Sequence, residues 1–85
     1  MTKEEIKKTV IDIIYNMFLE ANLDKNMVEY IDLAEDVGMD SIYYISIIIE
    51  IETQFGITLP DECILMENFR NVDKIVTIVA EQLLL

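Results

Sequence analysis

Hydrophobic residues recur at helical spacing near both ends of the chain. In the first twenty residues and in the last fourteen, apolar side chains follow one another at steps of three or four, as in an amphipathic helix. The two stripes are Ile6, Val10, Ile13, Ile14 and Met17, and Val72, Ile75, Val76, Val79 and Leu83. Thr2 and Glu5 form a capping box before the first stripe, and Asn71 is a good N-cap before the second. The pattern predicts helices over about residues 3–20 and 72–84.

The apolar pattern of residues 41–55 fits two kinds of secondary structure. Ile42, Ile45, Ile48 and Phe55 fit a helical stripe, and Asp40 is a good cap for a long run. Strand alternation is seen in a second set, Ile45, Ile47, Ile49 and Ile51. The segment holds six isoleucines, which favour a strand by propensity. The residues alone therefore leave both structures open, with a helix slightly favoured.

The remaining segments are predicted to connect the long helices. Residues 23–40 are polar and acidic, with a few apolar anchors: Leu23, Met27, Ile31, Leu33 and Val37. A loop this long needs a reason, so we expect it either to pack these anchors on the core or to belong to a binding face. Gly56 suits a helix end, Pro60 can open a short third helix over 61–66, and Phe69 suits an apolar anchor. Together these features predict one all-α domain over residues 1–85, a small, irregular four-helix bundle with a long first loop.

Charge narrows the choice of partners. The net charge is −11, and residues 26–69 contain no Lys or Arg. That stretch holds ten carboxylates: Glu29, Asp32, Glu35, Asp36, Asp40, Glu50, Glu52, Asp61, Glu62 and Glu67. Such a surface repels nucleic acid and anionic membranes and attracts basic patches on proteins. Composition alone favours a simpler explanation, in which these charges form a solvated surface that only keeps an apolar domain in solution.

Other features of the sequence limit the reactions and metal sites that the protein can have and the cellular compartment in which it is expected. The chain has no histidine, which excludes a Ser-His-Asp arrangement, and with one cysteine, Cys63, it predicts no metal site. Two glycines exclude a glycine-rich phosphate loop. The N-terminus lacks the apolar stretch of a signal peptide, no stretch is long enough to span a membrane, and an unpaired Cys63 suits a reducing compartment. We therefore expect a cytoplasmic protein that is not an enzyme.

The run Gly38-Met39-Asp40-Ser41-Ile42 is the strongest functional signal. Asp40 can cap the following helix, which places Ser41 at its first position. A phosphate ester on Ser41 would lie at the positive end of that helix, where anions are favoured. Nothing nearby in the sequence makes Ser41 a nucleophile. It therefore suits an attachment point, although an ordinary helix-start serine explains the same residue if it is taken alone.

Asp40-Ser41-Ile42 resembles the Asp-Ser-Leu attachment motif of acyl and peptidyl carrier proteins. The resemblance extends to the lead-in at 35–41 and to residues 51–62, and so covers nearly the whole chain. It implies that residues 41–55 form the second helix of a four-helix carrier fold. It also implies that Ser41 carries a 4′-phosphopantetheine arm, derived from coenzyme A, whose thiol holds an acyl or aminoacyl group as a thioester. Asp40 would then both cap the helix and present the serine.

The same resemblance implies the partners. They are a phosphopantetheinyl transferase, an acyl or aminoacyl ligase or acyltransferase, and condensing and tailoring enzymes. Contacts with them are expected along the second helix, at Ile42, Tyr43, Tyr44, Ile47, Glu50 and Glu52. The family's core positions, some of which can open around an acyl chain, correspond to Ile45, Ile48, Ile51, Leu59 and Ile64. We expect the carrier to be a monomer.

Two positions depart from the family pattern. Carriers of primary fatty-acid synthesis usually have acids where this chain has Tyr43 and Ser46. This departure favours a stand-alone carrier of a specialised pathway, for polyketide, nonribosomal peptide or modified acyl products, over the primary fatty-acid carrier. It also suggests a more apolar partner contact, although Tyr43 and Tyr44 would fit equally well against the long loop. A rival from another class is an acidic helical interaction module without a prosthetic group, which differs in that Ser41 never accepts the arm.

Overall fold

The protein is built from helices of two kinds. A computed structural model describes residues 1–84, and in this part of the chain it contains α-helices, short 3-10 helices (η) and no strand. In chain order the elements are α1 (Lys3–Met17), η1 (Leu19–Ala21), η2 (Lys25–Tyr30), α2 (Leu33–Asp36), α3 (Ser41–Phe55), η3 (Asp61–Cys63), η4 (Met66–Phe69) and α4 (Val72–Leu84). The all-α fold class is therefore confirmed.

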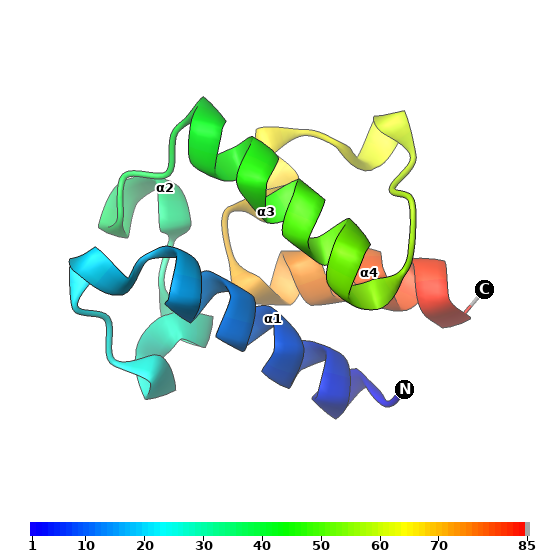
Figure 1. The fold of residues 1–85 in the computed structure, drawn as a ribbon, viewed down its shortest axis with the longest axis horizontal. Helices are drawn as coiled ribbons and strands as arrows, with labels where there is room; N and C mark the ends of the chain where they lie inside the picture. The colour runs from blue at the N-terminus through cyan, green and yellow to red at the C-terminus, as the bar shows by residue number, and fades with distance from the viewer. Residues whose placement is uncertain (85) are drawn as a thin grey trace.

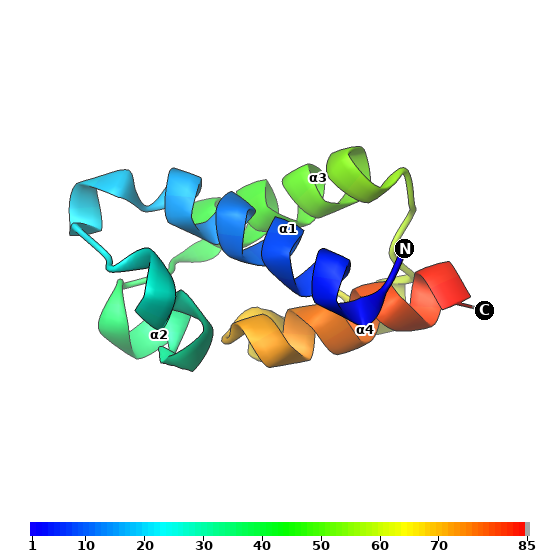
Figure 2. The ribbon, with the colours of Figure 1, turned by 90° about the horizontal axis from the view of Figure 1, so that it is seen from below.

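The three long helices enclose the core. α1 packs against both α3 and α4, and Figures 1 and 2 show the short elements η1, η2 and α2 gathered at the end of the molecule opposite the two termini. The fully buried side chains come from all parts of the chain: Ile6, Val10, Ile14, Val28, Leu33, Ile47, Ile51, Phe69, Val72, Ile75 and Val79. Both terminal stripes thus face the core, as their spacing predicts.

Local capping fixes the helix boundaries. The Thr2 hydroxyl accepts the Glu5 N–H at 3.2 Å and the Glu5 carboxylate accepts the Thr2 N–H at 2.8 Å, which completes the expected capping box. Asn71 caps α4 by accepting the Lys74 N–H at 2.9 Å. At the other end of α3, Gly56 adopts the left-handed conformation with φ 64°, where a side chain would be strained.

Two helices are shorter than the sequence predicts. α1 ends at Met17 rather than near residue 20, because Phe18 leaves helical geometry (ψ 36°) and buries its ring. The third helix does not run over 61–66. It ends at Cys63, and Ile64 (ψ 70°) turns the chain toward η4, whose Phe69 is fully buried.

The long connection is folded onto the core. η2 and α2 occupy its middle, Val28 and Leu33 are buried, and Leu23, Ile31 and Val37 pack against the buried cluster. Of the expected anchors, Met27 is the exception and lies exposed. The first of the two roles expected for this segment, packing its anchors on the core, is thus the one observed.

Candidate functional site

Ser41 begins α3 on the surface of the protein. It is exposed, and the carboxylate of Asp40 before it accepts the backbone N–H groups of Ile42 at 3.0 Å and Tyr43 at 3.1 Å. Asp40 itself has extended backbone geometry, as an N-cap requires. Since one carboxylate oxygen receives both N–H groups, Asp40 acts as a helix cap.

The segment that leads into Ser41 is held by a series of backbone hydrogen bonds. The Leu33 N–H donates to the carbonyl of Arg70 at 2.7 Å, and the Met39 N–H donates to the carbonyl of Leu33 at 2.9 Å. Leu33 and Met39 are buried, and between them Gly38 turns the chain with φ 67°. The start of α3 is therefore anchored through α2 to Arg70, two residues before α4.

Arg70 reinforces this anchor with its side chain. Its Nε and Nη2 atoms donate to the two carboxylate oxygens of Asp32 at 3.3 and 2.7 Å. Asp32 also caps α2 by accepting the N–H groups of Ala34 and Glu35. The Glu35 N–H and the Arg70 guanidinium both favour the ionised carboxylate and lower the pKa of Asp32. Sequence analysis missed this pair, because its partners lie 38 residues apart and are not brought together by any local motif.

The two tyrosines after Ser41 pack against other rings. The Tyr43 ring lies against Phe18, which follows α1, with centroids 4.7 Å apart, and Tyr44 meets Phe69 edge-on at 5.6 Å. Tyr43 keeps 38% of its surface exposed, whereas Tyr44 is half-buried, and this burial raises the pKa of its hydroxyl. The two aromatic partners, Phe18 and Phe69, lie outside the long connection, against which Tyr43 and Tyr44 were alternatively expected to pack.

The rotation of α3 about its axis corrects two assignments. Ile45 was expected in the core but is 54% exposed, whereas Ile47 was expected on the partner face but is fully buried. Because each residue advances about 100° around a helix, Ile47 lies on the buried side of α3 together with Ile48 and Ile51, and α3 packs against α1. Of the other expected core positions, Leu59 is buried and Ile64 is half-buried against the core.

The two expected acidic contacts have different roles. Glu50 is exposed on α3 and is available to a partner. The carboxylate of Glu52 instead accepts the backbone N–H of Leu59 at 2.9 Å, which holds the segment after α3 against the helix. Glu52 is thus at least partly a structural residue.

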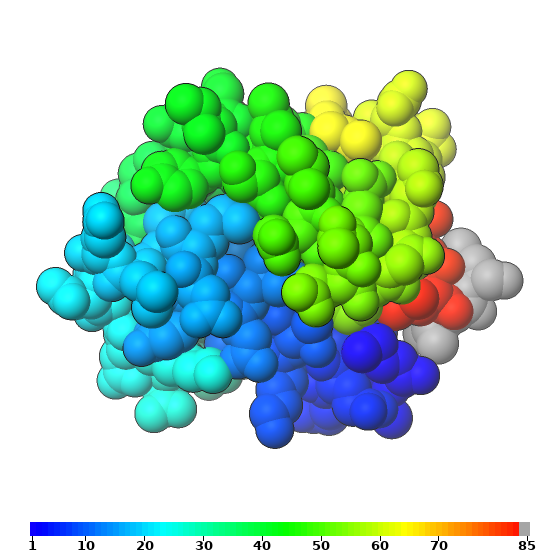
Figure 3. Space-filling model, in the orientation of Figure 1, coloured from blue at the N-terminus to red at the C-terminus, as the bar shows by residue number. Residues whose placement is uncertain are grey.

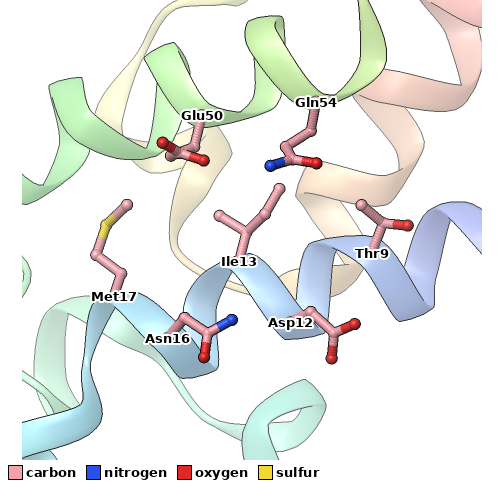
Figure 4. A pocket seen from close by; sticks show the side chains of 7 residues that line it. All are labelled: Thr9, Asp12, Ile13, Asn16, Met17, Glu50 and Gln54. Carbon is pink, nitrogen blue, oxygen red and sulfur yellow. The ribbon is translucent and has the colours of Figure 1, made fainter.

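A groove of about 610 Å³ lies between α1 and α3, away from Ser41. Figure 4 shows Glu50 and Gln54 pointing from α3 toward α1, and Ile13 and Met17 pointing from α1 toward α3. The lining combines polar side chains with the apolar Ile13 and Met17. No group of three or more His, Cys, Asp or Glu side chains that could hold a metal ion is found in residues 1–84. Nor is any helix in that range both long and apolar enough to cross a membrane.

The start of α3 suits a phosphate ester. The serine is exposed, the helix behind it is fifteen residues long, and its N-terminus is the positive end of the helix dipole. The Asp40 carboxylate is engaged by two N–H groups of the first turn, and the buried Met39 holds the chain segment that leads into the helix. The residues present therefore fit an anion carried on a serine side chain at a rigid base.

Comparison with known proteins agrees with a phosphate ester on a serine. The family described as "Phosphopantetheine attachment site" matches residues 21–83. Over 62 residues the chain is 37% identical to an acyl carrier protein of Chlorobium phaeovibrioides, over 73% of this chain and 77% of that protein. It is 31% identical to a D-alanyl carrier protein of Streptococcus suis, over 91% of this chain and 94% of that protein. It is also 28% identical to a mitochondrial acyl carrier protein of Neurospora crassa, over 96% of this chain but 59% of that protein.

The chain belongs to the phosphopantetheine-attachment family of carrier proteins. Its prosthetic group is a covalently attached 4′-phosphopantetheine. A carrier of this class works with the transferase that installs the group and with ligases or acyltransferases that load it. Proteins of this family generally hold intermediates and leave catalysis to their partners.

Proposed function

We propose that Ser41 is the attachment residue and that the protein carries acyl or aminoacyl groups for a specialised biosynthetic pathway. The observation that carries the assignment of Ser41 is its exposed position at the start of α3, directly after a carboxylate already engaged in capping. The only other serine, Ser46, is half-buried in the second turn.

The chain presents Ser41 and leaves the activation of its hydroxyl to the transferase. No histidine is present, and Asp40 is held by its two backbone contacts. In the transfer from coenzyme A, the Ser41 oxygen forms a bond to the phosphorus of the pantetheine phosphate, and the hydroxyl proton passes to a base of the transferase. The pyrophosphate P–O bond breaks, and adenosine 3′,5′-bisphosphate leaves. When bound, the arm supplies a thiol that holds the cargo as a thioester. We assign no catalytic residue to this chain.

The specialised pathway is supported by the surface of α3. Tyr43 and Ser46 stand where the resemblance leads us to expect acids, and Tyr43 packs on Phe18. The D-alanyl carrier protein among its relatives carries, by its name, an amino acid. The alternative within the class is a carrier of primary fatty-acid synthesis. We further propose a cytoplasmic monomer, which the unpaired Cys63 and the repulsion between copies of charge −11 support.

The assignment of Ser41 is tested by intact mass spectrometry. The protein is incubated with coenzyme A and a broad-specificity phosphopantetheinyl transferase, beside Ser41→Ala and the matched control Ser46→Ala. We expect the wild type and Ser46→Ala to gain one phosphopantetheine and Ser41→Ala to gain none. If folded wild type gains nothing even with a transferase from its own source, the interaction-module reading replaces ours.

The pathway is tested with the phosphopantetheinylated protein. It is offered to a malonyl acyltransferase with the condensing enzyme of fatty-acid synthesis, and separately to ligases for amino acids and modified acyl groups. Preferential loading by one of the ligases supports a specialised carrier. Efficient malonyl loading followed by elongation of a saturated chain would instead identify the primary fatty-acid carrier.

A further inference from the structure

Two neighbouring residues between η4 and α4 contact the chain on both sides of Ser41. The fully buried ring of Phe69 meets Tyr44 edge-on in the first turn of α3, and the carbonyl of Arg70 accepts the Leu33 N–H of α2 at 2.7 Å. In Figures 1 and 2 the chain before α4, in orange, lies beside α2. Ser41 therefore stands between two segments that residues 69 and 70 both hold.

The position of Ser41 depends on the segment that leads into it. Figure 3 shows α3, in green, at the surface of the molecule, with no other segment over its outward side in this view. The preceding residues 32–40, which we call the α2 segment, bury Leu33 and Met39 and join them by a hydrogen bond of 2.9 Å. A movement of α2 is therefore passed on through Met39 to the start of α3.

The α2 segment is crowded with negative charge. It contains four carboxylates, those of Asp32, Glu35, Asp36 and Asp40, and no Lys or Arg. Repulsion between like charges so close together favours an opened chain. Arg70 brings a cation against them, because its Nη2 atom lies 2.7 Å from Asp32 and 3.7 Å from Glu35. Its charge therefore offsets a repulsion that would loosen the segment.

The contact with Asp32 fixes orientation as well as charge. Nε and Nη2 of Arg70 donate to the two carboxylate oxygens, a forked arrangement that a lysine does not reproduce. Because Asp32 also caps α2, the guanidinium holds the first turn of that helix and not a free side chain. The two side chains are 37% and 34% exposed, and pairs this exposed add little to the stability of a whole domain. The effect of the pair is therefore local.

We propose that Arg70 is a positioning residue for the modification of Ser41, because it holds the α2 segment through Asp32 and so keeps the serine hydroxyl where the transferase needs it. This inference rests on the proposed attachment at Ser41. Arg70 acts through Asp32 and takes no part in the chemistry. Rates of group transfer depend steeply on placement, and a displacement of about 1 Å can cost on the order of 100-fold.

The test is the kinetics of modification by a broad-specificity phosphopantetheinyl transferase, both at steady state and in a single turnover at saturating transferase. The variants are Arg70→Gln, Asp32→Asn and the two combined, since asparagine keeps the cap of α2 but removes the charge. The matched control is Lys7→Gln. It removes the Lys7–Glu29 ion pair between α1 and η2, whose side chains are 34% and 23% exposed and lie outside the α2 segment. Circular dichroism and urea unfolding establish that each protein is folded.

We expect Arg70→Gln and Asp32→Asn each to lower the single-turnover rate constant about tenfold and to change KM by less than about twofold, because the transferase still binds but meets a misplaced hydroxyl. The double variant should be no slower than either single variant, since both changes break one contact. Arg70→Lys should recover part of the rate, because it restores the charge without the fork. A variant that was only less stable would instead raise the apparent KM and keep the rate constant, since its folded fraction reacts normally.

Amide hydrogen exchange of the unmodified protein gives a measurement that does not use the transferase. In Arg70→Gln we expect the Leu33 and Met39 amides to exchange about tenfold faster, and those of Val10 in α1 and Val79 in α4 to change by less than about threefold. Equal acceleration at all four amides would show that Arg70 only stabilises the domain as a whole, and would overturn the proposal.

Three kinetic results would also overturn it. They are an unchanged rate constant in Arg70→Gln, an equal loss in Lys7→Gln, and losses that add in the double variant. In each of these cases the wild type is still modified at Ser41. Failure of the proposed function itself would look different, because the wild type would never be modified, and it would remove this inference as well.

Discussion

A matched pair of substitutions tests the orientation of α3. Ile45 and Ile47 are two residues apart on the same helix, yet Ile45 is 54% exposed and Ile47 is fully buried. Replacing either with alanine removes the same atoms and gives the same small gain in helix propensity, a few tenths of a kcal/mol. The difference between the two variants in the free energy of unfolding therefore measures the effect of burial alone.

The magnitudes follow from the two environments. Truncating a fully buried isoleucine to alanine costs about 2–5 kcal/mol, because transfer and cavity terms add, so we expect Ile47→Ala to lose about 3 kcal/mol. Ile45→Ala removes atoms that are already largely in water and should change the free energy of unfolding by less than about 1 kcal/mol. For a domain of this size, about 3 kcal/mol lowers Tm by roughly 12–24 °C.

The assay is urea unfolding followed by circular dichroism, with thermal melts alongside. Because 3 kcal/mol is a large part of the usual 5–15 kcal/mol of a small domain, the milder Ile47→Val, which should cost about 1 kcal/mol, gives a second measurement if Ile47→Ala is partly unfolded. Equal losses at the two positions, or a larger loss at Ile45, would show that α3 is rotated differently from the structure described here.

Three further changes test the elements around Ser41. Asp40→Ala should lower stability by about 1 kcal/mol, because two N–H groups lose their acceptor, and Asp40→Asn should restore most of it in the same urea assay. Gly56→Ala meets no atom within 4 Å, so its expected cost of about 1 kcal/mol comes from the left-handed backbone alone, and Gly56→Asn should cost less by thermal melting. The lowered pKa of Asp32 contributes stability above its ordinary value near 3.8, and that stability is lost as pH falls through the folded pKa. Arg70→Gln should therefore reduce stability at neutral pH and make the loss of stability in acid less steep, as measured by the urea unfolding midpoint at a series of pH values. If the midpoint falls with pH in the variant as it does in the wild type, the Arg70–Asp32 contact contributes nothing to stability.

The sequence by itself determined the features that depend on residues close together in the chain. The Thr2 capping box, the caps at Asp40 and Asn71 and the left-handed Gly56 all use backbone groups within four residues. Such contacts are available to a short segment before any tertiary structure forms, and they therefore leave a readable pattern. The Asp40 cap also places Ser41 at the start of α3, once the family resemblance has assigned residues 41–55 to a helix.

Only the tertiary structure decided which side of α3 faces inward. Its six isoleucines are spread around the helix, so the stripe of Ile42, Ile45, Ile48 and Phe55 seen in the sequence does not fix its rotation, and two of its members, Ile42 and Ile45, are exposed. α1 and η4 select the buried side by packing against it, which places Ile47 inside and Ile45 outside. The same is true of the Arg70–Asp32 pair, the Glu52–Leu59 hydrogen bond and the Tyr43–Phe18 contact. Each of these contacts joins residues from different parts of the fold. The sequence around either residue does not predict where its partner will lie once the helices have packed.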